Sequence, residues 1–258
     1  PGRLLTPVDG ELHDAVAEKR PDARWLRGGF WRNFQVKYRE INDLHKQMLR
    51  TSAAVSGMPA GPDRATALDH LYQGQSNDCY WHGLFGGIYI SHMRLATYEH
   101  LIAAEDLADT AAGRRATAEL IDLDMDGLDD VRLADAGQVV TVDLSEGGGI
   151  GGWDIRAVRH ALAAVMRRRP EAYHETLRRH EAAGDAGCGG GDGSAPASIH
   201  DRVLTKESGL SERLRYDDHE RRSSLVRFLP LDATAMEWAD VTVADLGDFL
   251  DHPFEVAS

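Results

Sequence analysis

The spacing of apolar residues changes near residue 110, and this change constrains the fold more than any other feature of the sequence. Before it, apolar residues recur about every 3.6 positions in three segments, at 31–55, 67–72 and 84–107, which predicts amphipathic helices packed as a bundle. After it, Gln138–Ser145 alternates apolar and polar residues, as a strand does. We therefore predict two domains, a helical bundle in 1–113 and a mainly β domain in 114–258.

The second half contains few strand candidates for its length. Shorter candidates lie at 119–123 and 130–133, Ser223–Leu229 is a further one, and Val243–Leu250 is predicted as a short helix. Four or five strands are fewer than the roughly seven of a β-sandwich. The chain also begins with proline rather than methionine. We expect a multidomain, α-then-β portion of a longer protein, with an incomplete antiparallel β-sandwich.

Composition argues against two classes of partner. The net charge of −13 at pH 7 repels a phosphate backbone, and the densest basic run, Arg167–Arg169, is more typical of a solvated face. No stretch approaches the roughly 18 consecutive apolar residues of a membrane helix. We expect neither a nucleic-acid nor a membrane partner. Two cysteines, Cys79 and Cys188, cannot build a disulfide framework and suit a reducing compartment, so the cytoplasm is the expected location.

The segment Gln73–Arg94 carries the most informative cluster of polar side chains. Carboxamides and carboxylates hydrogen-bond paired sugar hydroxyls, and the face of an indole packs against a sugar ring. The cluster therefore predicts a carbohydrate-binding site; the alternative is a polar helix cap with its tryptophan in the core. The candidate substrate-binding residues are Gln75, Asn77, Asp78, Trp81 and His82.

A second motif runs from Asp122 to Asp130 and has the spacing of a calcium-binding loop. Carboxylates stand at positions 1, 3, 5 and 9 of the motif, with Gly127 at position 6 for the sharp turn. Position 12 is Leu133 instead of glutamate, which excludes a helical EF-hand. A structural calcium ion and a metal-free acidic turn both remain open. The candidate ligands are Asp122, Asp124, Asp126 and Asp130.

Three further features are given structural interpretations. Gly147–Gly152 has the G-x-G-x-x-G spacing of a dinucleotide site, and 153–166 can be read as the helix that follows. Since that fold needs several strand–helix units, we interpret the glycines as a turn between strands. His174 and His200 are interpreted as structural hydrogen-bonding residues, and Cys79 lacks the partners of a nucleophile. No cofactor for chemistry is expected.

The run Asn77–Tyr89 carries a family resemblance. It reads Asn-Asp-Cys-Tyr-Trp-His-Gly-Leu-Phe-Gly-Gly-Ile-Tyr, is followed by Arg94, and resembles the last of five signature regions of glycoside hydrolase family 57, in the α-amylase and 4-α-glucanotransferase branch. The segments 27–38 and 42–48 resemble the helical region before that signature. Three downstream segments, 168–175, 198–203 and 247–249, resemble parts of the β-sandwich that follows it.

The resemblance implies both an architecture and roles for residues. It implies that 1–113 completes the catalytic cleft of an amino-terminal barrel and that 114–258 is part of a galactose-mutarotase-like supersandwich. Trp81 would stack on a glucosyl ring, while Asp78 and His82 would hydrogen-bond hydroxyls or orient the acid. The family retains anomeric configuration through a glutamate nucleophile and an aspartate acid/base, and both lie in barrel signatures that this sequence does not match. No catalytic residue is therefore expected in this chain, which alone should not cleave a glycosidic bond.

Two functional hypotheses follow. In the first, the chain is the carboxy-terminal portion of an enzyme that acts on α-glucans or maltooligosaccharides, and its partner is the missing barrel domain. In the second, it is a non-catalytic α-glucan-binding or scaffold protein. Phe85, Ile88, Leu95 and Leu101 suggest more apolar helix surface than three helices can bury, which favours the first hypothesis because such a patch usually has a partner.

Overall fold

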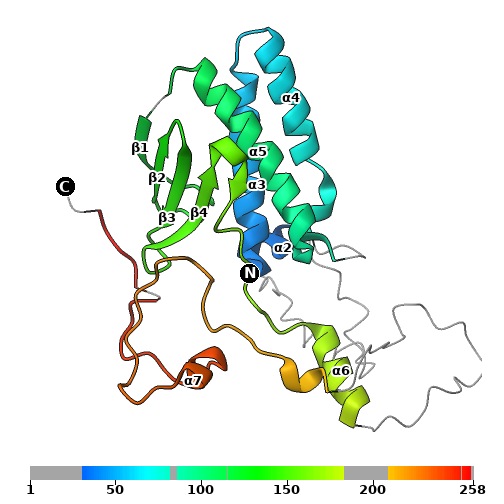
Figure 1. The fold of residues 1–258 in the computed structure, drawn as a ribbon, viewed down its shortest axis with the longest axis vertical. Coiled ribbons are helices and arrows are strands. Elements are labelled where there is room, and N and C mark those ends of the chain that lie inside the picture. The colour runs from blue at the N-terminus through cyan, green and yellow to red at the C-terminus, as the bar shows by residue number, and fades with distance from the viewer. Residues whose placement is uncertain (1–30, 82–85, 115, 183–208, 251, 257–258) are drawn as a thin grey trace, which may run out of the picture. The chain divides into compact units, whose positions relative to one another are not determined.

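The computed structural model describes residues 31–81, 86–114, 116–182, 209–250 and 252–256 (Figure 1). The chain divides into two compact units. The larger unit comprises 30–167, 219–234 and 243–258 and contains the helical region together with a sheet. The smaller unit is described at 168–182, 209–218 and 235–242. Among the described residues, no helix combines the length and the apolar character needed to cross a membrane.

Helices fill the first part of the larger unit, as the periodicity predicted. The segment 31–55 is helical but divides at Tyr38, whose backbone is extended (φ −115°, ψ 90°) and whose ring is buried. The second of its helices ends at Ser56, where the N–H of Gly57 bonds the carbonyls of the last turn. The elements are α2 (Trp31–Lys37), α3 (Arg39–Ser56), α4 (Pro62–Gly74), the 3₁₀ helices η2 (Asn77–Tyr80) and η3 (Gly87–Tyr89), and α5 (Ser91–Ala111).

The helix predicted at 84–107 was placed too early. The structure begins α5 at Ser91 and ends it at Ala111; residues 84 and 85 lie outside the described residues. Gly86 and Gly87 adopt positive φ angles of 115° and 47°, and this backbone cannot continue a right-handed helix. Ile88 follows them in the 3₁₀ helix η3 and is fully buried, as is Leu101, so the prediction that these two residues lie on apolar surface left uncovered by the helices is wrong. The apolar spacing therefore continues from η3 into α5, although a turn separates the two elements. The spacing alone does not show this turn.

The helices α3, α4 and α5 pack around an apolar core. Ile41 and Leu44 of α3, Ala67 and Leu71 of α4, and Leu101 of α5 are each 3% exposed or less. Their spacing of three or four residues along each helix puts them on one face, as an amphipathic helix requires. α3 and α5 then turn their other faces toward the sheet (Figure 1).

The sheet is a five-stranded antiparallel meander with the strand order β1-β2-β3-β4-β5. The strands predicted at 119–123, 130–133 and 138–145 each overlap an observed strand, with ends shifted by a few residues. An antiparallel sheet after a helical region is thus confirmed. The strands are β1 (Ala116–Ile121), β2 (Asp130–Asp135), β3 (Gln138–Asp143), β4 (Gly149–Ile155) and β5 (His160–Ala161).

The two faces of the sheet differ in exposure. Val139 pairs with Asp154, and both are buried on the face toward the helices. Val140 pairs with Trp153 on the opposite face, where Trp153 is 36% exposed and the neighbouring Leu133 is 45% exposed. The described residues form this one sheet and no second sheet. Whether a sandwich is completed there, and whether a domain boundary lies at residue 113, stay predictions.

Gly147 and Gly148 lie in the turn between β3 and β4, as predicted, whereas the glycines from Gly149 onward are part of β4 and not of a turn. Residues 153–166 contain the end of β4, the 3₁₀ helix η4 (Arg156–Val158) and β5 rather than an α-helix. A Cβ on Gly147 (φ 67°) would lie 2.5 Å from the carbonyl oxygen of Phe249, and one on Gly149 would collide with the side chain of Arg222. The glycines therefore allow the later segments of the chain to lie against β4. Those segments are irregular: the strand predicted at 223–229 is reduced to a single bridge between Ser223 and Ile150, and 243–250 contains no helix.

The smaller unit contains α6 (Ala172–Ala182), η6 (Ser211–Arg213) and α7 (Ala235–Ala239). Arg168 pairs with the buried carboxylate of Asp217 at 2.6 Å. The Nδ1 of His174 accepts the N–H of Glu171 at 3.1 Å and contacts the hydroxyl of Tyr216, also at 3.1 Å. These contacts confirm the structural interpretation of His174; His200 lies outside the described residues.

Candidate functional site

The predicted sugar-binding residues lie in one turn that follows α4. Gln75, Asn77 and Asp78 are exposed, and Trp81 is 43% exposed. Cys79 and Tyr80, which lie between them, are buried in the helical core. The 3₁₀ helix η2 thus turns two side chains inward and the polar side chains outward. His82 lies outside the described residues.

Contacts on both sides fix this turn. The hydroxyl of Tyr80 donates a hydrogen bond to the carbonyl of Gly74 at 2.5 Å, and the N–H of Ile88 donates to the carbonyl of Trp81 at 3.0 Å. Arg94 Nη1 donates in turn to the carbonyl of Ile88. Gly74 is required at its position because a Cβ there would lie 2.6 Å from Leu101 Cδ2. The exposed side chains therefore project from a rigid base.

This exposure bears on the alternative interpretation of the turn. Trp81 is not a core residue, and no side-chain hydrogen bond caps η2. Gln75 makes a weak contact, 3.5 Å from its Nε2 to Met48 Sδ. A carboxamide pair, a carboxylate and an indole on one exposed turn offer hydrogen bonds and a stacking surface to a sugar ring.

The acidic loop brings together three of the four aspartates predicted as ligands. The carboxylate of Asp122 accepts the N–H groups of Asp126 and Gly127 at 3.1 and 3.0 Å, and that of Asp130 accepts the N–H of Leu123 at 3.0 Å. Gly127 supplies the turn with a φ of 95°. Carboxylate oxygens of Asp122, Asp124 and Asp130 all lie within 4.8 Å of one another. Asp126 is not part of this group.

Electrostatics at the loop favour a cation but do not require one. Burial raises the pKa of Asp124 to about 6 and that of Asp130 to about 7, which means that these carboxylates ionise less readily than in water. A bound cation would stabilise the ionised forms. Arg39 already provides part of this charge, since its Nη2 lies 3.2 Å from Asp124 Oδ2. Oxygen ligands of this kind suit a hard cation such as calcium.

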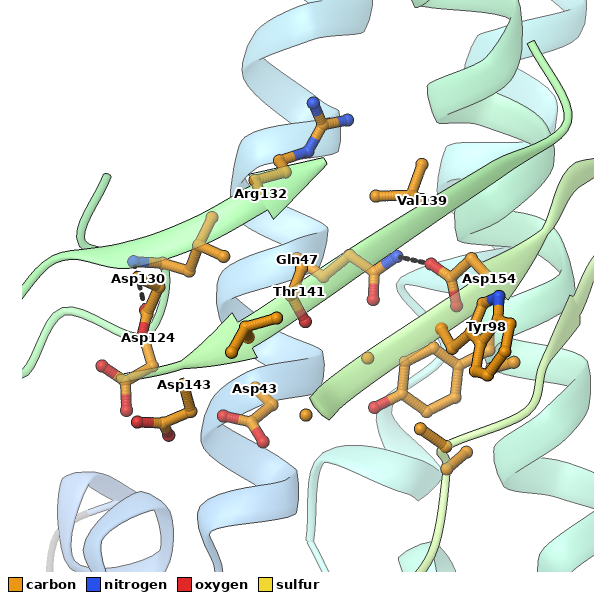
Figure 2. A pocket seen from close by; sticks show the side chains of 18 of the residues that line it. Asp43, Gln47, Tyr98, Asp124, Asp130, Arg132, Val139, Thr141, Asp143 and Asp154 are labelled. Carbon is orange, nitrogen blue, oxygen red and sulfur yellow. Dashed lines mark hydrogen bonds between the residues drawn. The ribbon is translucent and has the colours of Figure 1, made fainter. Parts of the chain in front are cut away.

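A polar cavity of about 70 Å³ lies between the helices and the sheet, and the sequence did not predict it (Figure 2). Figure 2 shows Asp43 and Gln47 reaching into it from α3, Tyr98 from α5, and Thr141 and Asp154 from the sheet. Gln47 Nε2 donates a hydrogen bond to Asp154 Oδ2 at 2.9 Å. Such a polar space suits a few ordered water molecules.

Charged side chains surround this cavity and join the helices to the sheet. Arg222 reaches Asp43 of α3 at 2.7 Å, Asp143 of β3 at 3.1 Å and Glu146 at 2.5 Å, although its side chain is only 9% exposed. Arg132 of β2 bonds Glu105 of α5. The carboxylates hold the pKa of both arginines above the ordinary value, against the effect of burial.

Asp154 is a buried carboxyl group of this interface, 7% exposed, and forms no ion pair with another described residue. Burial and the nearby charge of Glu105 raise its pKa to about 7, although the hydrogen bond from Gln47 and the more distant arginines lower it. A signal for this cavity was present in α3, where Asp43 and Gln47 stand four residues apart and so share a face. Periodicity does not specify the register between helix and sheet that places Asp154 opposite them.

Comparisons with known proteins agree with this architecture. Residues 29–108 match the model of the middle domain of alpha-amylase/4-alpha-glucanotransferase, and residues 122–258 match the model of the C-terminal domain of the same family. An alpha-amylase 1 from Dictyoglomus thermophilum is 33% identical over 96% of this chain and 35% of its own length. A 4-alpha-glucanotransferase from Thermococcus kodakarensis is 35% identical over 88% of this chain and 32% of its own.

A solved structure extends the comparison to the fold. The crystal structure of the 4-alpha-glucanotransferase from Thermococcus litoralis superimposes with a TM-score of 0.71 and 27% sequence identity, over 95% of this chain and 33% of that one. The chain spans about a third of the length of these relatives. It belongs to the alpha-amylase/4-alpha-glucanotransferase family of glycoside hydrolase family 57 and corresponds to the middle and C-terminal domains of its members.

Proposed function

We propose that this chain supplies part of the glucan-binding cleft of an α-glucan-acting enzyme, with 1–113 as the domain that completes the cleft and 114–258 as a supporting β domain. The observation that carries the proposal is the rigid turn at 75–81, which presents Asp78 and Trp81 outward beside Gln75 and Asn77. Trp81 stacks on a glucosyl ring, and Asp78 hydrogen-bonds its hydroxyls. The family resemblance gives His82 the same hydrogen-bonding role as Asp78. Catalysis belongs to a barrel domain elsewhere in the longer protein.

The test is a pair of substitutions in the longer polypeptide that includes the barrel. Trp81→Ala removes the stacking surface and should lower kcat/KM on maltooligosaccharides about tenfold or more. Tyr72→Ala is the matched control because Tyr72 is a 64% exposed aromatic residue of α4, shortly before the turn. Unchanged kinetics of the Trp81 variant would refute the assignment of this turn to substrate binding.

The second candidate function is a non-catalytic α-glucan-binding or scaffold protein. It draws on the same exposed turn and on the buried, unreactive setting of Cys79, whose pKa burial raises. We propose the cytoplasm as the location for either candidate, because the two cysteines suit a reducing compartment. The two candidates differ in whether the sugar is cleaved. The scaffold candidate predicts that the native polypeptide binds maltoheptaose without cleaving it. Release of shorter sugars by the native polypeptide would exclude it.

We also propose a structural calcium ion in the loop 122–130. The grouping of Asp122, Asp124 and Asp130 supports it, as do the raised pKa values of the two buried carboxyls. Since a ligand that binds only the folded state stabilises it, calcium at 100 times its Kd should add about 2.7 kcal/mol to the free energy of unfolding. The measurement is thermal unfolding with calcium or with a chelator, for the wild type and for Asp122→Asn. An equal Tm in calcium and chelator would leave the loop metal-free.

We propose further that the sheet is part of a β-sandwich that is incomplete in this chain and completed in the longer polypeptide. The outer face of the sheet supports it because Leu133, Val140 and Trp153 are apolar and incompletely covered. Contiguous apolar surface of this kind is typical of a face that meets another layer.

A further inference from the structure

Trp31, in the first turn of α2, is both exposed and held in place. It is 43% exposed, the same fraction as Trp81. Its Nε1–H donates to the carbonyl of Tyr80 at 3.2 Å. Its ring meets that of His45 edge to face, with centroids 4.4 Å apart and planes at 86°. An exposed indole whose N–H is already bonded offers a ligand its π surface rather than a hydrogen bond.

The residues behind Trp31 are fixed as well. His45 Nδ1 lies 2.7 Å from Gln35 Nε2 and 3.3 Å from Lys46 Nζ. Both neighbours are donors, so Nδ1 accepts. Burial, helped by the charge of Lys46, lowers the pKa of His45 to about 4, so the imidazole is neutral at pH 7. The ring that supports Trp31 is therefore an uncharged, oriented surface rather than a cation.

The contact with Tyr80 connects Trp31 to the turn at 75–81. Tyr80 directly precedes Trp81, and only the buried Cys79 separates it from Asp78, which is exposed together with Asn77. Trp31 therefore lies against the same short turn as Trp81. Trp31 borders this turn, and Trp81 is part of it together with the carboxamides of Gln75 and Asn77 and the carboxylate of Asp78. A chain of several sugars can use more than one stacking surface.

We propose that Trp31 is a second stacking platform, so that the turn binds at least two glucosyl units of an α-glucan. This rests on the proposed function of the turn and adds a residue that the signature region does not include. Because Trp31 is already held by Tyr80 and His45, it loses little conformational freedom when a sugar binds, which favours affinity.

The experiment labels the protein with 5-fluorotryptophan and follows ¹⁹F NMR during titration with maltoheptaose. The chain contains five tryptophans, so five resonances are expected, each assigned by a single Trp→Phe substitution. The resonances of Trp31 and Trp81 should shift with the same apparent Kd. Trp153 on the sheet and Trp238 in α7 are internal controls, partly exposed at 36% and 48%, and should not shift.

The outcomes separate this inference from the proposed function. A shift of Trp81 without one of Trp31 overturns the second platform and leaves the binding turn intact. If neither resonance shifts, both the platform and the binding role of the turn are overturned. Since the measurement uses the labelled native sequence, it does not depend on whether a truncated Trp31 variant folds.

Affinity as a function of sugar length provides the second measurement. Trp31→Ala should weaken maltoheptaose binding about threefold to tenfold, as expected for one lost stacking contact, and should change maltose binding less, because a disaccharide can occupy Trp81 alone. Trp153→Ala is the matched control and should alter neither affinity. An equal loss for maltose and maltoheptaose would show that Trp31 acts on the shape of the turn and not as a separate platform.

Discussion

The core among α3, α4 and α5 consists of apolar side chains, whereas the interface between these helices and the sheet is largely ionic. Leu44, Leu71 and Leu101 are at most 3% exposed within the helical core. Across the interface, Arg132 and Arg222 join carboxylates of α3, α5, β3 and the β3–β4 turn. The same helices thus meet one neighbour through apolar contact and the other through charge.

This difference has a physical consequence. Apolar packing tolerates many arrangements of similar volume, because it is not directional. A buried ion pair needs each partner at its position, and losing one leaves an uncompensated charge. The helical core therefore holds the binding turn in place with little dependence on pH, while the seating of the sheet on the helices depends on the protonation of buried carboxyls.

The largest effect is expected from Arg222→Met. Methionine keeps the apolar contacts but removes the cation that joins Asp43, Asp143 and Glu146, so that Arg39 remains beside Glu146 while Asp43 loses its partner. The free energy of unfolding should fall by about 3–5 kcal/mol, measured by urea unfolding. Arg221→Met is the control, because the neighbouring Arg221 is exposed and should cost less than about 1 kcal/mol. Equal effects of the two substitutions would mean that the network contributes nothing specific.

Leu101→Ala tests the apolar core in the same assay. Leu101 is fully buried and contacts Gly74 below the binding turn, so its truncation leaves a cavity and should cost about 2–5 kcal/mol. Unlike the ionic interface, the core should show the same loss at pH 5 and pH 8. Leu49→Ala, at a 38% exposed position of α3, should cost less than about 1 kcal/mol. A strong pH dependence of the Leu101 effect would contradict the comparison.

Asp154→Asn sharpens the pH side of the comparison. The pKa of Asp154 is raised to about 7 in the folded protein, against about 3.9 in an unfolded chain. The folded state then holds the proton between these values, so the stability that this group contributes is full below about pH 4 and is lost as pH rises through 7. Asparagine does not ionise and should avoid that loss.

The expected result is that the difference in unfolding free energy between Asp154→Asn and the wild type changes with pH. The stability of Asp154→Asn relative to wild type should rise by about 2–4 kcal/mol between pH 4 and pH 8, measured by urea unfolding at several pH values. Other titrating groups are common to both proteins and cancel in the difference. A constant offset across this range would show that Asp154 ionises normally.

Much of the fold was predictable because its signals are local. The spacing of Ile41, Leu44 and their successors is a property of one helix, and the alternation at Gln138–Ser145 is a property of one strand. The errors have local causes too. Because Gly86 and Gly87 have positive φ angles, α5 begins after them rather than at residue 84. The segment 223–229 has the composition of a strand but forms only one bridge.

The candidate site was predictable only in part. The exposed turn 75–81 and the acidic loop were found because their residues are adjacent in the sequence. The cavity was missed because Gln47 and Asp154 are 107 residues apart, and so was Trp31, whose bond to Tyr80 spans 49 residues. Pairings of this kind depend on the register between elements, which periodicity does not specify.

The smallest effect on stability is expected from valine-to-threonine substitutions on the two faces of the sheet. Val139 faces the helices and is 6% exposed, whereas its neighbour Val140 is half-buried on the outer face. Replacing a buried methyl group by a hydroxyl costs about 1–3 kcal/mol when the hydroxyl finds no partner, so Val139→Thr should destabilise this chain by that amount. Val140→Thr should cost about 0.5 kcal/mol or less, since solvent reaches its side chain.

In the longer polypeptide, a second layer over the outer face would bury Val140 and raise the cost of Val140→Thr to that of Val139→Thr. If urea unfolding gives a small cost for Val140→Thr in both contexts, the outer face remains open and the β-sandwich proposal fails.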